Sequence, residues 1–410
     1  MIARRRFLAG LAGLTGGAML AAPRRARAAW GTWPEEHADL QLAPERRAAR
    51  VLELFVYGGL CPWDSLYCAP SWGLGEQRYL YAFGEAALAE RLAACDVPDD
   101  LGDGLALPFA EDAAGELIHL GPWAAALWRR PDVLARTRLV VGRHDQFPHS
   151  TAIPLALTGR RLGRPELAGT AAAIARHFAE VEGGASTPRA CVIHPGDIAR
   201  LDNVQSALAI GAHPSASRPL ELDLGQLPQL LELLERPAVS GDAPAFDALV
   251  GRYRDRYAAR LRGPSGAALH APELRAWEAV DGARRSAESL AQWLPPGVFG
   301  LGQGQACGTA RPSMTAMGAR VARHVLQGAT AGSPAARYAL WIDGGLEPTL
   351  DGGHDTHRDH LIHAPRNYSH TFATLAAAIA DPSSPSDKDD PTKLDLDDTL
   401  VVITSEFGRT

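Results

Sequence analysis

The chain has 410 residues, of which 46% are hydrophobic and 21% charged, and its formal net charge is −6 at pH 7. An acidic chain argues against nucleic acid as a partner, because binding to phosphates needs a basic surface. The length suits one large α/β domain or two domains, with enough apolar side chains for a substantial core.

The first 28 residues have the pattern of a twin-arginine signal peptide. A pair of arginines precedes Phe-Leu in MIARRRFLAG, an apolar and small-residue run covers 7–22, and an A-x-A cleavage pattern lies at 26–28. The run is short beside the roughly 20 strongly apolar residues of a membrane span. We therefore expect cleavage and a periplasmic or secreted protein with no stable membrane span; the alternative is an uncleaved anchor. Cleavage removes six arginines and no acids, so the charge falls from −6 to −12.

The mature chain, 29–410, alternates apolar runs with segments of helical periodicity. This alternation predicts an α/β fold with a mostly parallel central sheet flanked by helices. The predicted strands are 51–59, 138–145, 189–197, 337–345 and 399–408. The predicted helices are 227–236, 243–262, 272–294 and 313–327.

Two segments and one cysteine pair stand apart from this pattern. The stretch from about 215 to 300 is mainly helical and arginine-rich, which indicates a helical insertion or cap. The stretch 381–398, rich in proline, serine and aspartate, predicts an exposed acidic loop, with a cation site as the less favoured reading. Disulfides persist outside the cytoplasm, and Cys61 and Cys68 are a candidate pair.

Polar side chains follow four of the predicted strands. In a parallel sheet the carboxyl ends of the strands share one edge, where ligands bind. We therefore expect these side chains to meet there. They are Asp64 after the first strand; His144, Asp145 and His149 after the second; Asp343, Asp355, His357 and His360 after the fourth; and Glu406 and Arg409 after the last.

The stretch GGHDTHRDHLIH, 352–363, holds four histidines and two aspartates and predicts a metal site. Oxygen and nitrogen ligands without thiolates suit zinc, manganese or magnesium. Such an ion would polarise an ester oxygen and lower the pKa of a bound water or hydroxyl toward about 7. The alternatives are a polar surface loop for this stretch and turn or helix caps for the single acids.

A helix is expected to begin near Ser150 and Thr151. A hydroxyl at a helix N-terminus lies where backbone N–H groups stabilise an anion, so either residue is a candidate nucleophile. Serine at this position is also the usual N-cap. Arg409 can bind an anionic group through two hydrogen bonds, or pair with an acid.

Several motifs together resemble the bacterial family named domain of unknown function 1501, which is similar to the alkaline phosphatase and sulfatase-like superfamily. They occur in order across nearly the whole mature chain, and the helical middle carries none of them. They are the twin-arginine start, GGLCPWDSLY (58–67), RHDQFPHSTAIPLALTG (143–159), GGHDTHRDH (352–360) and LVVITSEFGRT (400–410).

The resemblance implies an alkaline-phosphatase-like core with divalent metal at the strand ends. It implies metal ligands at Asp64, at Asp355 with His357, and at Glu406, while His360 is a substitute or partner for His357. His149 and Ser150 match the segment where superfamily enzymes place a nucleophile. The implied roles are attack by Ser150, Thr151 or a metal-held water, with Arg409 or His149 steadying the anion.

The sequence departs from the superfamily pattern in two places. Phe407 follows Glu406 where the better-known enzymes have histidine, and the chain stops at Thr410, before a downstream D-H element. Either the chain is a fragment or it lacks that ligand. The expected function is a metal-dependent hydrolase-like protein for small-molecule or polysaccharide esters of phosphate or sulfate. The alternative is a non-catalytic envelope protein with a structural metal that binds a polysaccharide or a protein partner.

Overall fold

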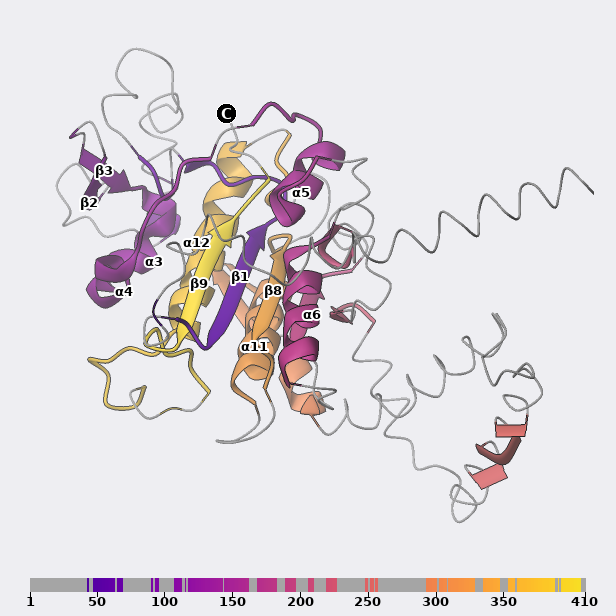
Figure 1. Ribbon diagram of the computed structural model, residues 1–410. Helices are drawn as coiled ribbons and strands as arrows, with labels where there is room; N and C mark the ends of the chain where they lie inside the picture. The colour runs from indigo at the N-terminus through magenta and orange to yellow at the C-terminus, as the bar shows by residue number, and fades with distance from the viewer. Residues whose placement is uncertain are drawn as a thin grey trace, which may run out of the picture.

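Figure 1 shows the computed structural model of the protein. The structure describes residues 43, 47–62, 65–68, 90, 93–95, 107–112, 115, 117–142, 144–161, 168–182, 189–196, 206–209, 219–226, 248–249, 251–253, 255–256, 293–300, 302–307, 309–328, 335–346, 353–357, 360–387, 390 and 392–406.

The centre of the fold is a five-stranded sheet in the order β5-β4-β8-β1-β9, and every neighbouring pair is parallel. The predicted α/β class is therefore confirmed. The two strands that flank β1 end level with it, because Val56 lies opposite Asp343 and Phe55 opposite Thr404. The strand bounds are Arg50–Val56 for β1, Ala190–His194 for β4, Leu220–Asp223 for β5, Tyr338–Asp343 for β8 and Thr399–Thr404 for β9.

Alternate residues of the central strands pack on opposite faces, as the period of two in a strand requires. In β8, Trp341 joins the core beneath helices α11 and α12, whereas Leu340 and Ile342 join the core beneath α5 and α6. The sheet is thus a layer between two helical layers (Figure 1). The helices are α5, His149–Thr158; α6, Thr170–Glu182; α11, Met314–Gln327; and α12, His360–Ala378.

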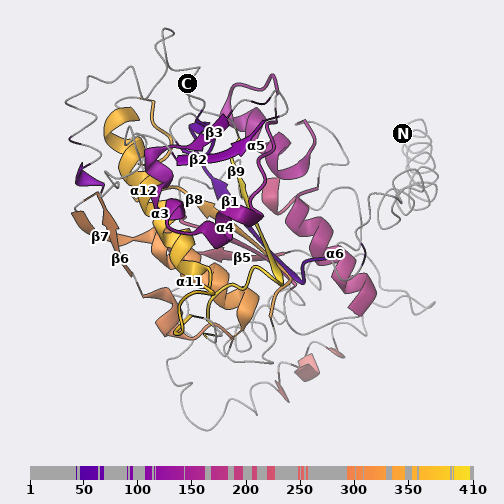
Figure 2. The ribbon, with the colours of Figure 1, turned by 90° about the vertical axis from the view of Figure 1, so that its left-hand side faces the viewer.

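Smaller elements pack around α12. Figure 2 shows the β6–β7 hairpin beside it, and α12 also contacts η6 and α3. A disulfide joins Cys95 to Cys307, while Cys61 and Cys68 are buried and not disulfide-bonded, so the candidate pairing of those two is wrong. The bounds are Leu107–Glu111 for β2, Leu117–Leu120 for β3, Pro122–Ala124 for η6, Ala125–Trp128 for α3, Pro131–Arg136 for α4, Pro296–Phe299 for η8, Gly302–Ala306 for β6 and Thr309–Ser313 for β7.

The predicted strand at 138–145 is wrong. The described residues of this segment are not in a strand, and Val140 is 92% exposed. Arg136 pairs with Asp397 at 2.6 Å before β9 begins, and His144 contacts the carbonyl of Glu406 at 2.6 Å after β9 ends. The segment therefore spans the length of β9, but it forms no ladder with it among the described residues, since the described pairing of β9 is with β1.

The acidic loop 381–398 lies at the amino ends of the strands, because it leads directly into β9. Its described part is a series of turns that its own aspartates close: Asp381 accepts from Ser383 N, Asp390 from Thr392 N and Asp395 from Asp397 N. These carboxylates satisfy local backbone donors, as in Asx turns. The loop therefore has a structural explanation that needs no cation.

Only parts of the predicted helical insertion at 215–300 are described. Residues 248–249, 251–253 and 255–256 are helical, within the predicted helix 243–262. Strand β5 falls in the same range and belongs to the central sheet. Three predicted segments lie outside the described residues: the helix 227–236, nearly all of the helix 272–294, and the expected signal peptide. Among the described helices, none has the length and apolar character needed to cross a membrane.

Candidate metal centre

The carboxyl ends of β1, β8 and β9 meet the loop 353–357 and the first residue of α5. The backbone N–H of Tyr57 donates to the carbonyl of Asp343 at 2.9 Å, which carries the β1–β8 pairing past the ends of the strands. Contacts described below bring His149 and Glu406 to the same place. This is the sheet edge at which the strand order predicts a ligand site.

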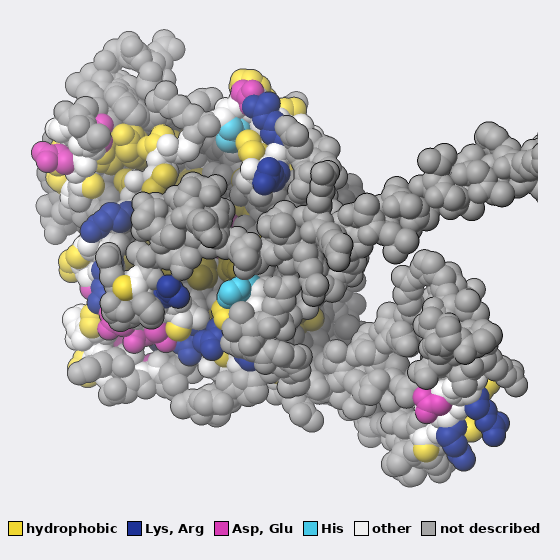
Figure 3. Space-filling view, in the orientation of Figure 1, with side chains coloured by type: hydrophobic (Ala, Val, Ile, Leu, Met, Phe, Trp, Pro, Cys, Tyr) yellow, Lys and Arg dark blue, Asp and Glu magenta, His cyan; other side chains and the backbone are white. Residues whose placement is uncertain are grey.

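His149, Asp355 and His357 form a cluster in which one ligand atom from each residue lies within 4.8 Å of the other two. His149 Nε2 is 3.3 Å, and His357 Nε2 is 3.1 Å, from Asp355 Oδ1. Asp355 is buried, His149 is half-buried and the side chain of His357 is 55% exposed. The cluster is thus open to solvent on the His357 side. Figure 3 shows histidine side chains at the surface of this face of the molecule.

The geometry of the cluster fits a divalent metal ion. Metal–ligand bonds of about 2.0–2.1 Å at tetrahedral angles place neighbouring ligand atoms about 3.3 Å apart. The two distances to Asp355 Oδ1 are close to this value. Two imidazoles and one carboxylate suit zinc or manganese better than magnesium, which prefers oxygen ligands and water. Three protein ligands also leave a coordination position open, as catalytic zinc sites do.

Glu406 lies directly behind His149. Its carboxylate Oε1 accepts a hydrogen bond from Gly58 N at 2.7 Å and lies 2.8 Å from His149 Nδ1. The residue is 1% exposed, and its Oε2 has no hydrogen-bond partner among the described residues. A buried carboxylate in this position needs cationic or hydrogen-bonding groups around it, because burial penalises the charge.

Close backbone packing holds the loop 353–357 against the end of β1. A β-carbon on Gly58 would lie 2.3 Å from Asp355 N, so only glycine permits this approach, and its φ of +108° also favours glycine. On the other side, Asn367 of α12 donates to the carbonyl of Gly353 at 2.8 Å and accepts from Leu346 N at 2.9 Å. Both sides of the loop are therefore fixed by elements of the core.

A buried polar network continues beneath this loop. Asp343, at the end of β8, accepts hydrogen bonds from Thr315 at 2.7 Å and Thr371 at 2.5 Å, and lies 3.1 Å from His354 Nε2. Burial by itself raises the pKa of Asp343, but the interactions with His354 and the two threonine hydroxyls outweigh it and lower that pKa to about 2. The His354 ring stacks on Tyr368, with centroids 5.3 Å apart. The network connects Asp355 through its neighbour His354 to the core.

This network predicts a pH dependence of stability. The folded-state pKa of Asp343 is below its ordinary value of 3.8. Its contribution, on the order of 2 kcal/mol, is therefore complete above pH 4 and is lost as the pH falls toward 2. Urea unfolding at several pH values should show that Asp343→Asn is less stable than the wild type at pH 5. The difference in their free energies of unfolding should become smaller between pH 4 and 2. A difference that stays constant over this range would contradict the lowered pKa of Asp343.

The structure brings some of the predicted site residues together, whereas others lie apart from them or outside the described residues. Asp355 and His357 lie in the cluster, and His149, predicted as a catalytic group, joins them. Asp64 and Arg409 lie outside the described residues. His360 begins α12, and its Nδ1 lies 2.8 Å from Thr356 Oγ1. His354 lies within the predicted stretch but was not selected individually, because its burial is a tertiary property that a single sequence does not show.

The two candidate nucleophiles lie in the first turn of α5. Ser150 is exposed. The hydroxyl of Thr151 donates to the carbonyl of Pro148 at 3.0 Å, so it is engaged within the first turn of the helix. Ser150 is therefore the better placed of the two.

No family model matches the chain, and neither a curated protein nor a solved structure matches it. Any functional conclusion therefore rests on the geometry of the cluster and on the motifs of the sequence.

Proposed function

We propose that the protein is an exported, metal-dependent hydrolase-like protein that acts on phosphate or sulfate esters. The observation that carries the proposal is the convergence of His149, Asp355 and His357 at the carboxyl edge of a parallel sheet. We also propose that the protein has an alkaline-phosphatase-like core and is related to the domain of unknown function 1501 family. The parallel sheet between two helical layers supports it.

In this proposal His149, Asp355 and His357 hold the metal. A divalent ion bound there polarises an ester oxygen and offsets the negative charge of a phosphate or sulfate group. Because His149 is the first residue of α5, the helix N-terminus faces the same place. The positive end of the helix dipole favours an anion there.

The remaining roles follow from position. Ser150 is the proposed nucleophile, because it follows a metal ligand in the chain and its side chain is exposed at the helix end. Asp64 as a further ligand and Arg409 as an anion-binding group stay as sequence-based proposals. The acidic chain with a solvent-open cluster is suited to small-molecule or polysaccharide esters rather than to nucleic acid.

The test is metal content by mass spectrometry on protein purified without chelator, followed by assays with p-nitrophenyl phosphate and p-nitrocatechol sulfate. Wild type should carry near-stoichiometric zinc or manganese and hydrolyse one of the esters. Asp355→Ala should lose metal and turnover, whereas Ser150→Ala should keep the metal and lose turnover.

Two results would change the proposal. If chelation removes metal, lowers the melting temperature and changes no ester hydrolysis, the ion is structural. The protein is then better described as a non-catalytic envelope protein that binds a polysaccharide or a protein partner. If wild type carries no metal and binds none on titration, the metal site itself is wrong.

A further inference from the structure

Glu406 contacts one of the three cluster residues through the ring nitrogen that faces away from Asp355. His149 Nδ1 is 2.8 Å from Glu406 Oε1, and His149 Nε2 is 3.3 Å from Asp355 Oδ1. The two nitrogens of one imidazole therefore face two different carboxylates. The sequence motif alone had suggested that Glu406 binds the metal directly.

The contacts of Glu406 fix its position from three directions. Its Oε1 accepts from Gly58 N, its carbonyl lies 2.6 Å from His144 Nε2, and its side chain is fully buried at the end of β9. His144 Nδ1 accepts a hydrogen bond from Gln146 N, so the proton of this imidazole is on Nε2, which donates to the Glu406 carbonyl. Both the backbone and the carboxylate of Glu406 are thus held in place.

The position of Glu406 selects one tautomer of His149. An ionised carboxylate can only accept hydrogen bonds, so His149 Nδ1 carries the ring proton and donates a hydrogen bond to Oε1. The lone pair of His149 is then on Nε2, on the side of Asp355. A neutral imidazole in this form is the state that binds a metal ion.

We propose that Glu406 is a positioning residue that orients His149 Nε2 toward the metal, and not itself a metal ligand. This proposal rests on the metal centre of the proposed function. A carboxylate behind a ligating histidine fixes the ring and raises its basicity, and replacing such a partner typically weakens metal affinity by about 10–100-fold.

The experiment is zinc titration of the apoprotein together with X-ray absorption spectroscopy of the zinc-loaded protein. Glu406→Gln retains an oxygen acceptor for Gly58 N and His149 but removes the charge. We expect zinc to bind about tenfold more weakly, with the same two imidazoles and the same number of oxygen ligands as in wild type. His149→Ala, in contrast, should lose one imidazole.

Glu53→Gln is the matched control. Glu53 is a half-buried glutamate within β1 that accepts hydrogen bonds from Tyr338 and, at 3.2 Å, from Thr404. It lies on the same sheet but away from the strand ends. Its replacement should leave zinc affinity unchanged. An equal loss of affinity in both variants would overturn the positioning role, since it would reflect a general effect of losing a carboxylate from this sheet.

A second measurement uses the wild type alone and therefore does not depend on the folding of a variant. Nitrogen-15 spectra of the zinc-loaded protein should show His149 coordinated through Nε2 and protonated at Nδ1. The proposal would be overturned by coordination through Nδ1 or by the absence of zinc binding in wild type. It would also be overturned if Glu406→Gln had a changed ligand set or an unchanged zinc affinity. Neither of these measurements uses a substrate. A protein that binds zinc as expected but hydrolyses no ester would therefore contradict the proposed function and still support this inference.

Discussion

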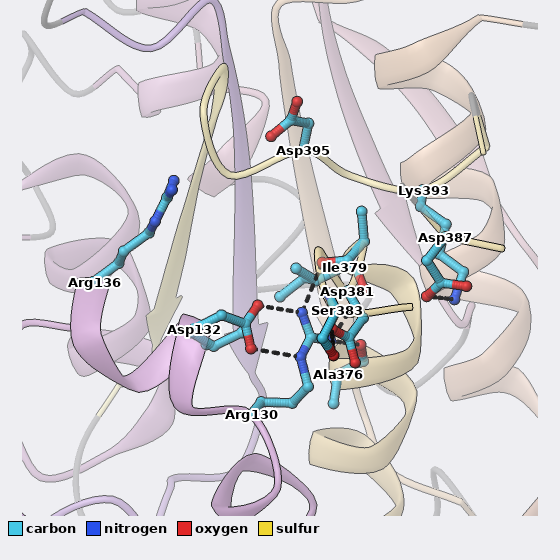
Figure 4. A network of polar contacts seen from close by, with 12 residues as sticks. Arg130, Asp132, Arg136, Ala376, Ile379, Asp381, Ser383, Asp387, Lys393 and Asp395 are labelled. Carbon is cyan, nitrogen blue, oxygen red and sulfur yellow. Dashed lines mark hydrogen bonds and ion pairs between the residues drawn. The ribbon is translucent and has the colours of Figure 1, made fainter. Parts of the chain in front are cut away.

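Replacing Arg130 with methionine is expected to lower the free energy of unfolding by about 3 kcal/mol. Arg130 is buried and its guanidinium donates to three carbonyls at the C-terminal end of α12: those of Ala376 at 2.9 Å, Ile379 at 3.1 Å and Ala380 at 2.7 Å. It also forms two hydrogen bonds with Asp132, at 2.9 and 2.7 Å (Figure 4). Methionine keeps most of the volume but leaves these carbonyls and the carboxylate without their donor.

The matched control is Arg136→Met. Arg136 pairs with Asp397 at 2.6 Å, but the two side chains are 54% and 74% exposed. Exposed ion pairs contribute about 0–1 kcal/mol, so this variant should be nearly as stable as wild type. Urea unfolding of both variants measures the difference. If Arg130→Met and Arg136→Met lose similar free energies of unfolding, Arg130 does not stabilise the end of α12 in the way its contacts indicate.

Replacing Arg130 should also affect the candidate site, since α12 begins beside that site. Asn367 and Tyr368 come from this helix: Asn367 holds the loop at Gly353, and the Tyr368 hydroxyl donates to Gly59 O at 3.0 Å. A helix loosened at its far end holds these contacts less firmly. Stability and site geometry are therefore coupled through one helix.

The strands of the central sheet were predictable where the sequence has a continuous apolar run. β1, β4, β8 and β9 are short apolar runs with polar or glycine residues after them, and all four were predicted. The run at 138–145 has the same local character, but a strand also needs a partner, and pairing with β9 is not encoded in a local pattern. α12 was not predicted, because buried polar residues such as Asn367 and Thr371 interrupt its apolar stripe.

The candidate site was predictable as a set of strand-end residues but not as a geometry. The chemistry of the stretch 352–363 predicted a metal site, and the family resemblance selected Asp355 and His357 within it, with His360 as the alternative to His357. The place of His149 beside them depends on contacts between residues about 200 positions apart. So does its contact with Glu406, which lies 257 positions away. No spacing rule in a single sequence reports such contacts, so the sequence predicted a catalytic role for His149 and a metal-ligand role for Glu406 without their mutual contact.

Gly58→Ala is expected to damage the candidate metal centre through the loop that carries Asp355. The new β-carbon would lie 2.3 Å from Asp355 N and 2.5 Å from its Cα, both of them backbone atoms that cannot rotate away. The residue would also have to keep a φ of +108°. The strain and the displaced loop together should cost about 3 kcal/mol of stability. Zinc affinity should fall by at least about tenfold, because Asp355 moves.

Gly115→Ala separates the steric effect from the backbone effect. Gly115 also has a positive φ, +81°, but an added β-carbon there meets no atom within 4 Å. This variant should lose about 1 kcal/mol from backbone strain alone and bind zinc like the wild type. Denaturant unfolding and zinc titration of both variants give the comparison. Wild-type zinc affinity in Gly58→Ala would mean that the 353–357 loop does not need its close contact with β1. The metal ligands would then have to be sought elsewhere along the strand ends.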